Sequence, residues 1–316
     1  MGVIDSLSTG YRYLGWRLYL LVVPVLLDIL LWFTPRLSVA PLFERAARLY
    51  ADPVLTKGIP VDVIDMVQQG LARAGQSSNL LEVLINNSLL HVPSLLVMLS
   101  PLPGVVIRNI AEPMTAVGFS VLFGLLGLLF GVIFIDLLAQ RLPIGATPKT
   151  LAVGDFMLIA LRHWFKLILF VIVTALCVIA LYIPISISAT LLMLFSPALG
   201  VFMLVIMSGL LFVLYFYLYF VPAGLIMDNL GLRAAIVQSF RLVRANFWST
   251  IGFFLVTYLI NGGFNLIFDR VALYQPLGTL AAILANAYLG TGMALALLIF
   301  YRTKLLRASG EFVKGT

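Results

Sequence analysis

Long apolar runs alternate along this chain with short stretches in which polar and apolar residues recur at helical spacing. The clearest case covers residues 228–261, where an amphipathic segment leads directly into an apolar one. At about 100° per residue, a bulky apolar row falls on one side of the segment and a mostly basic row falls roughly opposite. Such a helix can lie in the lipid headgroup layer, so we expect an interfacial helix before a membrane span. The apolar row is Leu232, Ile236, Phe240, Val243 and Phe247, and the polar row is Arg233, Gln238, Arg241 and Arg244.

Two roles are open for this helix. It either only orients the span that follows, or it also binds lipid headgroups, since each basic residue near an anionic surface contributes on the order of 1 kcal/mol. Trp248 stands where the chain turns toward the apolar run, and an indole suits the boundary between water and lipid. The candidate headgroup contacts are Arg162, Lys166, Arg233, Arg241, Arg244 and Trp248.

Six apolar runs approach the length that crosses a bilayer. They cover residues 18–33, 114–138, 165–183, 199–225, 250–268 and 277–301, and residues 184–190 are expected to form a tight return. Looser copies of the basic amphipathic pattern occupy residues 4–18 and 147–166. The sequence therefore predicts an all-α, polytopic membrane helical bundle. Its six transmembrane helices would form three hairpins, each preceded by a cytoplasmic interfacial amphipathic helix, in repeated units of 1–140, 141–228 and 229–316.

Residues 35–113 form the largest segment outside the predicted spans, and they contain six acidic and six basic residues. Short amphipathic helices are expected over residues 42–50 and 61–74. Residues 79–99 are more apolar, but Asn86, Asn87 and His91 interrupt them, so they are expected to lie on the membrane or to re-enter it partway. We interpret residues 1–316 as a single membrane domain with 35–113 as an extracytoplasmic helical insertion between spans 1 and 2.

The composition excludes an ordinary soluble fold. Of the 316 residues, 62% are hydrophobic and 10% are charged, whereas soluble domains carry about 25% charged residues. The net charge of +7 is modest and nothing indicates a nucleic-acid partner. With the N-terminus inside, thirteen of the 20 basic residues fall on the cytoplasmic side and the short outer loops hold only Arg270. This distribution predicts a multi-pass protein of the cell (inner) membrane with both termini cytoplasmic.

The last third of the chain carries a family resemblance. The run from Val221-Pro222 through Asp228 to Gly252 contains Ser239, Arg244, Asn246, Phe247 and Trp248. It resembles the membrane domain associated with glycerophosphoryl diester phosphodiesterases and its stand-alone relatives. The resemblance implies a six-helix membrane domain with no well-defined activity of its own, because the phosphodiesterase chemistry belongs to a separate soluble, metal-dependent domain. No stretch of this chain is long and polar enough for that domain, so the hydrolase activity is not expected here.

Asp28 is the one carboxylate well inside a predicted span. Because an unpaired charge there is costly, Asp28 is either a proton- or cation-coupled site, or a structural residue. In the structural case it is neutral, or it is hydrogen-bonded to Asn261, Asn265 or Asn286 on later spans.

Two further acids, Asp136 and Asp228, lie at the cytoplasmic ends of spans. They are expected to pair with a nearby arginine or to cap the following helix. His163 adjoins Trp164 and is expected at the interface, and it cannot form a metal site with the distant His91. No catalytic triad, phosphate loop or zinc motif is visible, and no cofactor is expected. The arginines considered as partners of the two acids are Arg141, Arg233 and Arg244.

These observations favour a non-enzymatic membrane scaffold or accessory subunit that contacts membrane lipids, with another membrane subunit as a further conceivable partner. The alternative is a transporter or permease component for a lipid or another amphiphile, with Asp28 and the three asparagines along its pathway.

Overall fold

The computed structural model describes residues 2–15, 17–51, 61–85, 92–95, 106–142 and 152–308. The chain divides into two compact units. Unit 1 comprises Met1–Arg17, Val132–Ile260 and Gly292–Thr316, and unit 2 comprises Leu18–Gly131 and Asn261–Thr291. Three long helices contribute residues to both units: α6 (Pro113–Arg141), α11 (Phe247–Ala272) and α12 (Leu277–Ala308).

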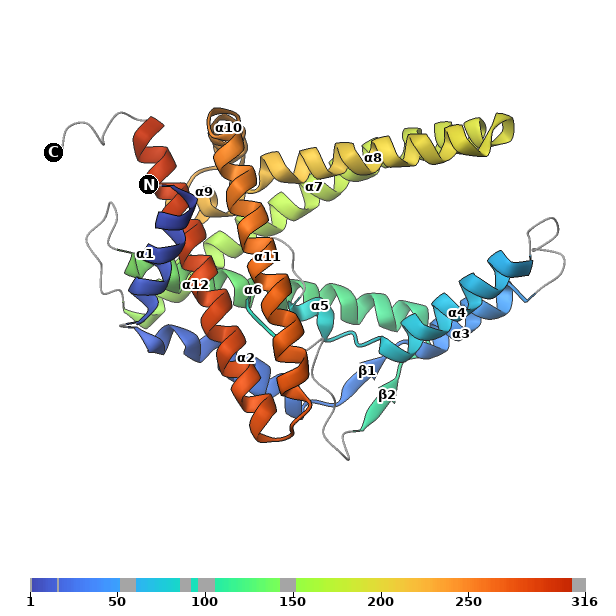
Figure 1. Cartoon of the computed structure of the whole chain (residues 1–316), viewed down its shortest axis with the longest axis horizontal. Coiled ribbons are helices and arrows are strands. Elements are labelled where there is room, and N and C mark those ends of the chain that lie inside the picture. The colour runs from blue at the N-terminus through green and yellow to red at the C-terminus, as the bar shows by residue number, and fades with distance from the viewer. Residues whose placement is uncertain are drawn as a thin grey trace. The chain divides into compact units, whose positions relative to one another are not determined.

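Helices make up nearly all of both units (Figure 1). The remaining elements of unit 1 are α1 (Val3–Gly15), α7 (Val153–Phe195), α8 (Pro197–Leu218), α9 (Val221–Met227) and α10 (Leu232–Ala245). Those of unit 2 are η1 (Leu18–Leu21), α2 (Val22–Phe33), β1 (Arg36–Ser38), α3 (Ala40–Leu49), α4 (Val61–Ser77), α5 (Glu82–Ile85) and β2 (Ile107–Asn109).

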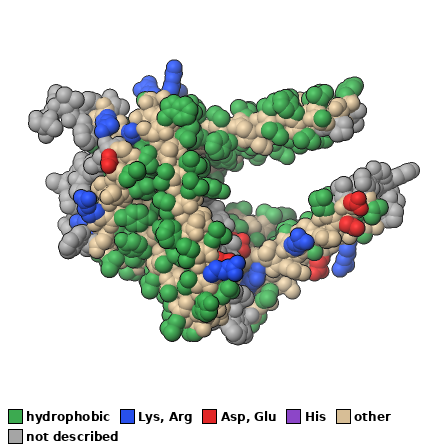
Figure 2. All heavy atoms as spheres, viewed as in Figure 1, with side chains coloured by type: hydrophobic (Ala, Val, Ile, Leu, Met, Phe, Trp, Pro, Cys, Tyr) green, Lys and Arg blue, Asp and Glu red, His purple; other side chains and the backbone are tan. Residues whose placement is uncertain are grey.

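The apolar helices fit a multi-pass membrane protein, as predicted. Within the described residues, five helical stretches are long and apolar enough to cross a membrane: α6, α7, α8 together with α9, α11 and α12. A sixth crossing is present if α1 and η1–α2 count as one broken span. Figure 2 shows hydrophobic side chains over much of the outer surface of these helices, as expected of helices that face lipid.

The predicted tight return at residues 184–190 is wrong. α7 continues through Pro184 to Phe195, and the chain turns to α8 only at Ser196. A proline removes one helical hydrogen bond, yet within hydrocarbon a broken helix would expose far more unpaired backbone. The interfacial helix expected before the third span is not separate from it, because residues 153–166 form the first turns of α7. Residues 147–151 of that expected helix lie outside the described residues.

α7 and α8 pack side by side as a hairpin (Figure 1). No charged residue occurs between Lys166 and Asp228. Hydroxyl groups in the second half of α7 bond back to the helix itself: Ser188 Oγ donates to the carbonyl of Pro184 at 2.8 Å. At about 1.5 Å per residue, the uncharged part of α7 is about 43 Å long, whereas a hydrocarbon core is about 30 Å thick. The hairpin is therefore long enough to span a bilayer with a substantial tilt.

Unit 2 contains the segment expected as a helical insertion. α3 and α4 pack together, with the Cβ of Phe43 3.2 Å from where a side chain on Gly75 would begin. These helices match the two that were predicted. The parallel pairing of β1 with β2, in which Arg36 is opposite Ile107, was not predicted, because strands of three residues are too short to show a periodicity. Residues 86–91, with the two asparagines and the histidine noted above, lie outside the described residues.

A row of small residues on α6 allows a close contact with α5 in unit 2. A Cβ atom on Gly127 would lie 1.9 Å from the carbonyl oxygen of Leu84 in α5, and one on Gly124 would lie 3.8 Å from Val83. The row therefore packs against α5 of the same chain. This contact requires glycine at residue 127, because any side chain would overlap the backbone of Leu84.

We predict that Gly127→Ala lowers stability by about 1–3 kcal/mol, the usual cost of overpacking a filled interior. Gly118→Ala is the matched control, since nothing lies within 4 Å of its position on the same helix and alanine favours helix. Thermal unfolding in detergent measures both. Equal melting temperatures for the two variants would contradict the α5–α6 contact.

Candidate functional site

A polar network in unit 1 is centred on Asp228, at the C-terminal end of α9. Its Oδ1 accepts a hydrogen bond from Arg302 Nη1 at 2.5 Å, and its Oδ2 accepts from Tyr301 OH at 2.5 Å and Gln238 Nε2 at 3.1 Å. The absence of a side chain on Gly224 leaves room for the Tyr301 hydroxyl, which would be 3.2 Å from a Cβ there. The network joins α9 and α10 to α12. The expected arginine partners of Asp228 are therefore wrong, since Arg302 takes that place.

Ser239 bridges the break between α8 and α9. Its hydroxyl donates to the carbonyl of Tyr217 at 2.6 Å and accepts from the backbone N–H of Phe220 at 3.2 Å. Pro222 and the interrupted helix leave these backbone groups without their usual helical partners. A buried serine of α10 therefore supplies bonds that the α8–α9 chain cannot make, and it fixes α10 against the end of α8.

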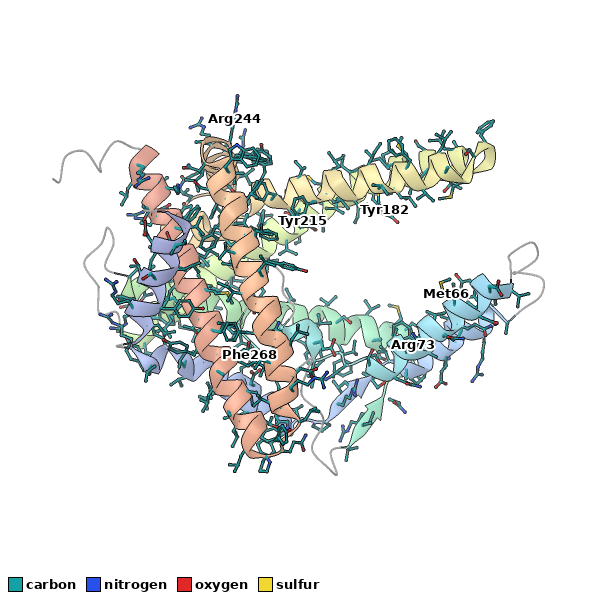
Figure 3. The ribbon with its side chains drawn as sticks, viewed as in Figure 1. Met66, Arg73, Tyr182, Tyr215, Arg244 and Phe268 are labelled. Carbon is teal, nitrogen blue, oxygen red and sulfur yellow. The ribbon has the colours of Figure 1, made fainter. Side chains whose placement is uncertain are left out.

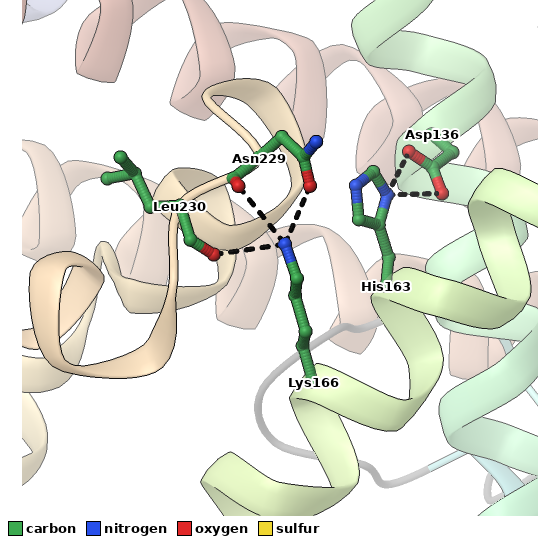
Figure 4. A network of polar contacts seen from close by, with 5 residues as sticks. All are labelled: Asp136, His163, Lys166, Asn229 and Leu230. Carbon is green, nitrogen blue, oxygen red and sulfur yellow. Dashed lines mark hydrogen bonds and ion pairs between the residues drawn. The ribbon is translucent and has the colours of Figure 1, made fainter.

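Lys166 was expected to reach lipid headgroups, but it binds the loop between α9 and α10 (Figure 4). Its ammonium donates to the carbonyl oxygens of Asn229 and Leu230, both at 3.1 Å, and to Asn229 Oδ1 at 2.6 Å. These three acceptors use all three N–H groups of a lysine. Asn229 has a positive φ of 50°, a conformation that asparagine adopts more readily than most residues. Lys166 therefore stabilises the turn that starts α10.

Asp136 and His163 form a buried pair between α6 and α7 (Figure 4). His163 Nδ1 lies 2.9 Å from Oδ1 and 3.1 Å from Oδ2 of the carboxylate, and both residues are buried. The arginine partners expected for Asp136 are wrong, because the sequence does not show that α6 and α7 pack along these two residues. The interfacial level expected for His163 stays a prediction.

The three arginines of α10 lie on the outer side of the helix. The side that packs against the protein contains Ala235, Ser239, Leu242 and Val243. Arg233, Arg241 and Arg244 are exposed, and none of the described acidic residues lies within ion-pair distance of them. Figure 3 shows Arg244 pointing away from the helices. Trp248 is 81% exposed, and Arg162 on α7 is also exposed.

Asp28 is fully buried in unit 2. It accepts a hydrogen bond from the Ser94 hydroxyl and another from the backbone N–H of Leu95 at 3.1 Å. The expected asparagine partners are therefore wrong, and the partner is the short segment 92–95. Its position could not be inferred from the sequence, because Ser94 and Leu95 lie 66 and 67 residues after Asp28, within the insertion.

The three candidate asparagines of unit 2 do not converge on Asp28. Asn261 and Asn265 are half-buried on α11, and Asn286 is buried on α12. Asn286 Nδ2 and Trp32 Nε1 are buried, and neither has a hydrogen-bond partner among the described residues. Buried donors without acceptors are uncommon in folded proteins.

The described part of the chain holds no group of three or more His, Cys, Asp or Glu side chains that could bind a metal ion. The residues missed from the sequence, above all Tyr301, Arg302 and Ser94, are hydrogen-bond partners of Asp228 and Asp28. The sequence did contain one indication for Tyr301 and Arg302. They stand at the end of the last apolar run, which is the position that Asp228 has at the end of the fourth apolar run.

We predict that Ser239→Ala destabilises the protein by about 1–3 kcal/mol, since it leaves two buried backbone groups unpaired. Ser208→Ala is the control: the Ser208 hydroxyl donates to the carbonyl of Leu204 on its own exposed helix surface, and its loss is expected to change stability by less than about 0.5 kcal/mol. Chemical or thermal unfolding in detergent tests the difference. A Ser239 variant as stable as the control would refute the bridging role.

Comparison of the chain with protein-family models, with curated proteins and with solved structures finds no match. The resemblance of residues 221–252 to the phosphodiesterase-associated membrane domain stays a prediction. Function is therefore inferred from the contacts of the described residues.

Proposed function

We propose that the protein is a non-enzymatic membrane scaffold or accessory subunit that holds anionic lipid headgroups against α10. The observation that carries this proposal is the set of three exposed arginines on the outer side of α10, which have no ion-pair partner among the described residues. Other polar side chains of unit 1 are used differently, because Asp136, Asp228 and Lys166 each bind another part of the protein.

The surface of α10 suits an interfacial position. Val237 and Phe240 are exposed between the arginines, so apolar and cationic groups alternate around the same outer side. In the headgroup layer, the apolar side chains would reach the acyl boundary while the guanidinium groups meet phosphate oxygens. The exposed indole of Trp248 would mark the same level at the start of α11.

An orientation in the membrane belongs to this proposal. If α10 lies at the inner leaflet, the positive-inside rule places both termini in the cytoplasm, and six crossings arranged as three hairpins follow. Residues 35–113 are then extracytoplasmic. The proposal also places the protein in the cell (inner) membrane. Its partners would be lipids and a second membrane subunit, and it would have no enzymatic activity.

Replacing Arg241 and Arg244 together with Gln is predicted to weaken binding of anionic lipid by the detergent-solubilised protein. Two lost contacts of about 1 kcal/mol each amount to roughly a thirtyfold change in affinity at low salt. Titration of the solubilised protein with short-chain anionic and zwitterionic phospholipids measures the change. The effect should shrink as salt rises, because exposed charges are screened.

Arg45 and Arg48, replaced together by Gln, provide the matched control. They are exposed on α3 in the insertion, so the same net charge is lost away from α10. Equal lipid affinity for the two double variants would contradict a role for α10.

A second function, a pathway for a lipid or another amphiphile through unit 2, is supported by the buried donors of Asn286 and Trp32, which lack acceptors among the described residues. In a pathway, water would reach the side chains of Asn286 and Trp32, whereas in a packed scaffold it would be excluded from them. In a Cys177→Ala background, Asn286→Cys is predicted to stay unlabelled by a small charged thiol reagent if the scaffold proposal holds. Rapid labelling from the aqueous phase would favour transport instead, with Ala287→Cys on the same buried part of α12 as a test of local specificity.

A further inference from the structure

Lys304, near the C-terminal end of α12, is a buried cation. The residue is only 6% exposed. Its ammonium lies 5.2 Å from the ring centroid of Phe300, one helical turn earlier. Among the residues that the structure describes, no carboxylate lies within ion-pair distance of it. Charges on largely buried residues are normally paired, and the described surroundings of Lys304 supply no acidic partner.

The surroundings of Lys304 add positive rather than negative potential. Arg307 follows three residues later and so lies on the same side of α12. α1 packs against α12 so closely that a Cβ on Gly10 would lie 2.9 Å from both the Ala296 nitrogen and the Gly292 oxygen. Figure 1 shows α1 beginning beside the C-terminal part of α12 and running along it in the opposite direction. The N-terminal end of α1, which is the positive end of its dipole, therefore lies beside the C-terminal part of α12.

Two internal interactions stabilise the ammonium without neutralising it. The face of the Phe300 ring attracts a cation, and the C-terminal end of α12 carries partial negative charge, but neither has a net charge. Asp5, the acid in the first turn of α1, is exposed, and its Oδ2 accepts from the backbone N–H of Gly2 at 2.7 Å. It caps its own helix and is not available to Lys304 in this arrangement.

We propose that Lys304 and Arg307 bind one phosphate group, with Lys304 as the buried contact and Arg307 as the outer one. A phosphate offers several acceptor oxygens and a full negative charge, which none of the described residues near Lys304 supplies. The site differs from the α10 surface because Lys304 is largely buried, whereas the three arginines of α10 are exposed. It does not depend on lipid binding by α10. The phosphate belongs either to a lipid headgroup or to a soluble phosphate compound.

Native mass spectrometry of the protein purified in phosphate-free detergent tests the site. The wild-type protein is expected to retain one phospholipid per chain if the source is a lipid. Lys304→Gln should lower that occupancy at least tenfold, and Arg307→Gln should lower it severalfold. Arg241→Gln with Arg244→Gln should leave it unchanged, so failure of the α10 proposal and failure of this one give different results.

A second measurement, on delipidated protein, distinguishes a lipid headgroup from a soluble phosphate compound as the source of the phosphate. A rise in melting temperature with phosphatidylglycerol but not with inorganic phosphate indicates a headgroup, and the reverse indicates a soluble phosphate compound. Both rises should be absent in Lys304→Gln. If that variant does not fold, Arg307→Gln, which alters an exposed residue, and Lys304→Arg, which retains the charge, decide the outcome.

Two results would overturn the site. One is equal lipid occupancy and equal stabilisation in wild type and Arg307→Gln. The other is that neither ligand binds wild-type protein while Glu311→Gln lowers its stability, which would show that an acid from the C-terminal residues outside the described part neutralises Lys304.

Discussion

A polar group in hydrocarbon has no water to bind, so it must find its partner inside the protein. In unit 1 this constraint links neighbouring helices at a few points. Asp136 with His163 joins α6 to α7, Lys166 joins α7 to the loop before α10, and Asp228 with Arg302 joins α9 to α12. In the Asp228–Arg302 pair, removing one partner would leave an uncompensated charge on the other.

These pairings determine where α10 lies and which of its sides faces outward. Ser239 fixes the inner side of the helix to the break between α8 and α9, and Gln238 attaches it to the Asp228 network. The inner side therefore combines the hydrogen-bonding Ser239 with the buried apolar residues Ala235, Leu242 and Val243. The arginines are left on the outside, where they can meet a surface of opposite charge.

The sequence was sufficient for the features that depend on hydrophobic pattern alone. It predicted a helical multi-pass protein and the two amphipathic helices that became α3 and α4. It was insufficient where the outcome depends on which helices pack together. The partner of Asp28 is a segment far along the chain, and His163 is buried only because α6 covers it. Pro184 shows a further limit, since a proline that ends a helix in water can be retained inside a long apolar one.

The position of α10 at the headgroup layer can be measured directly by electron paramagnetic resonance. A nitroxide is attached at residue 244 through the substitution Arg244→Cys in a Cys177→Ala background, and it reports its depth through collisions with oxygen and with a water-soluble nickel complex. We predict a depth at the level of the lipid phosphates in bilayers that contain anionic lipid. A label that collides with the nickel complex as freely as one in bulk water would contradict this position of α10, and so would one buried in the hydrocarbon core.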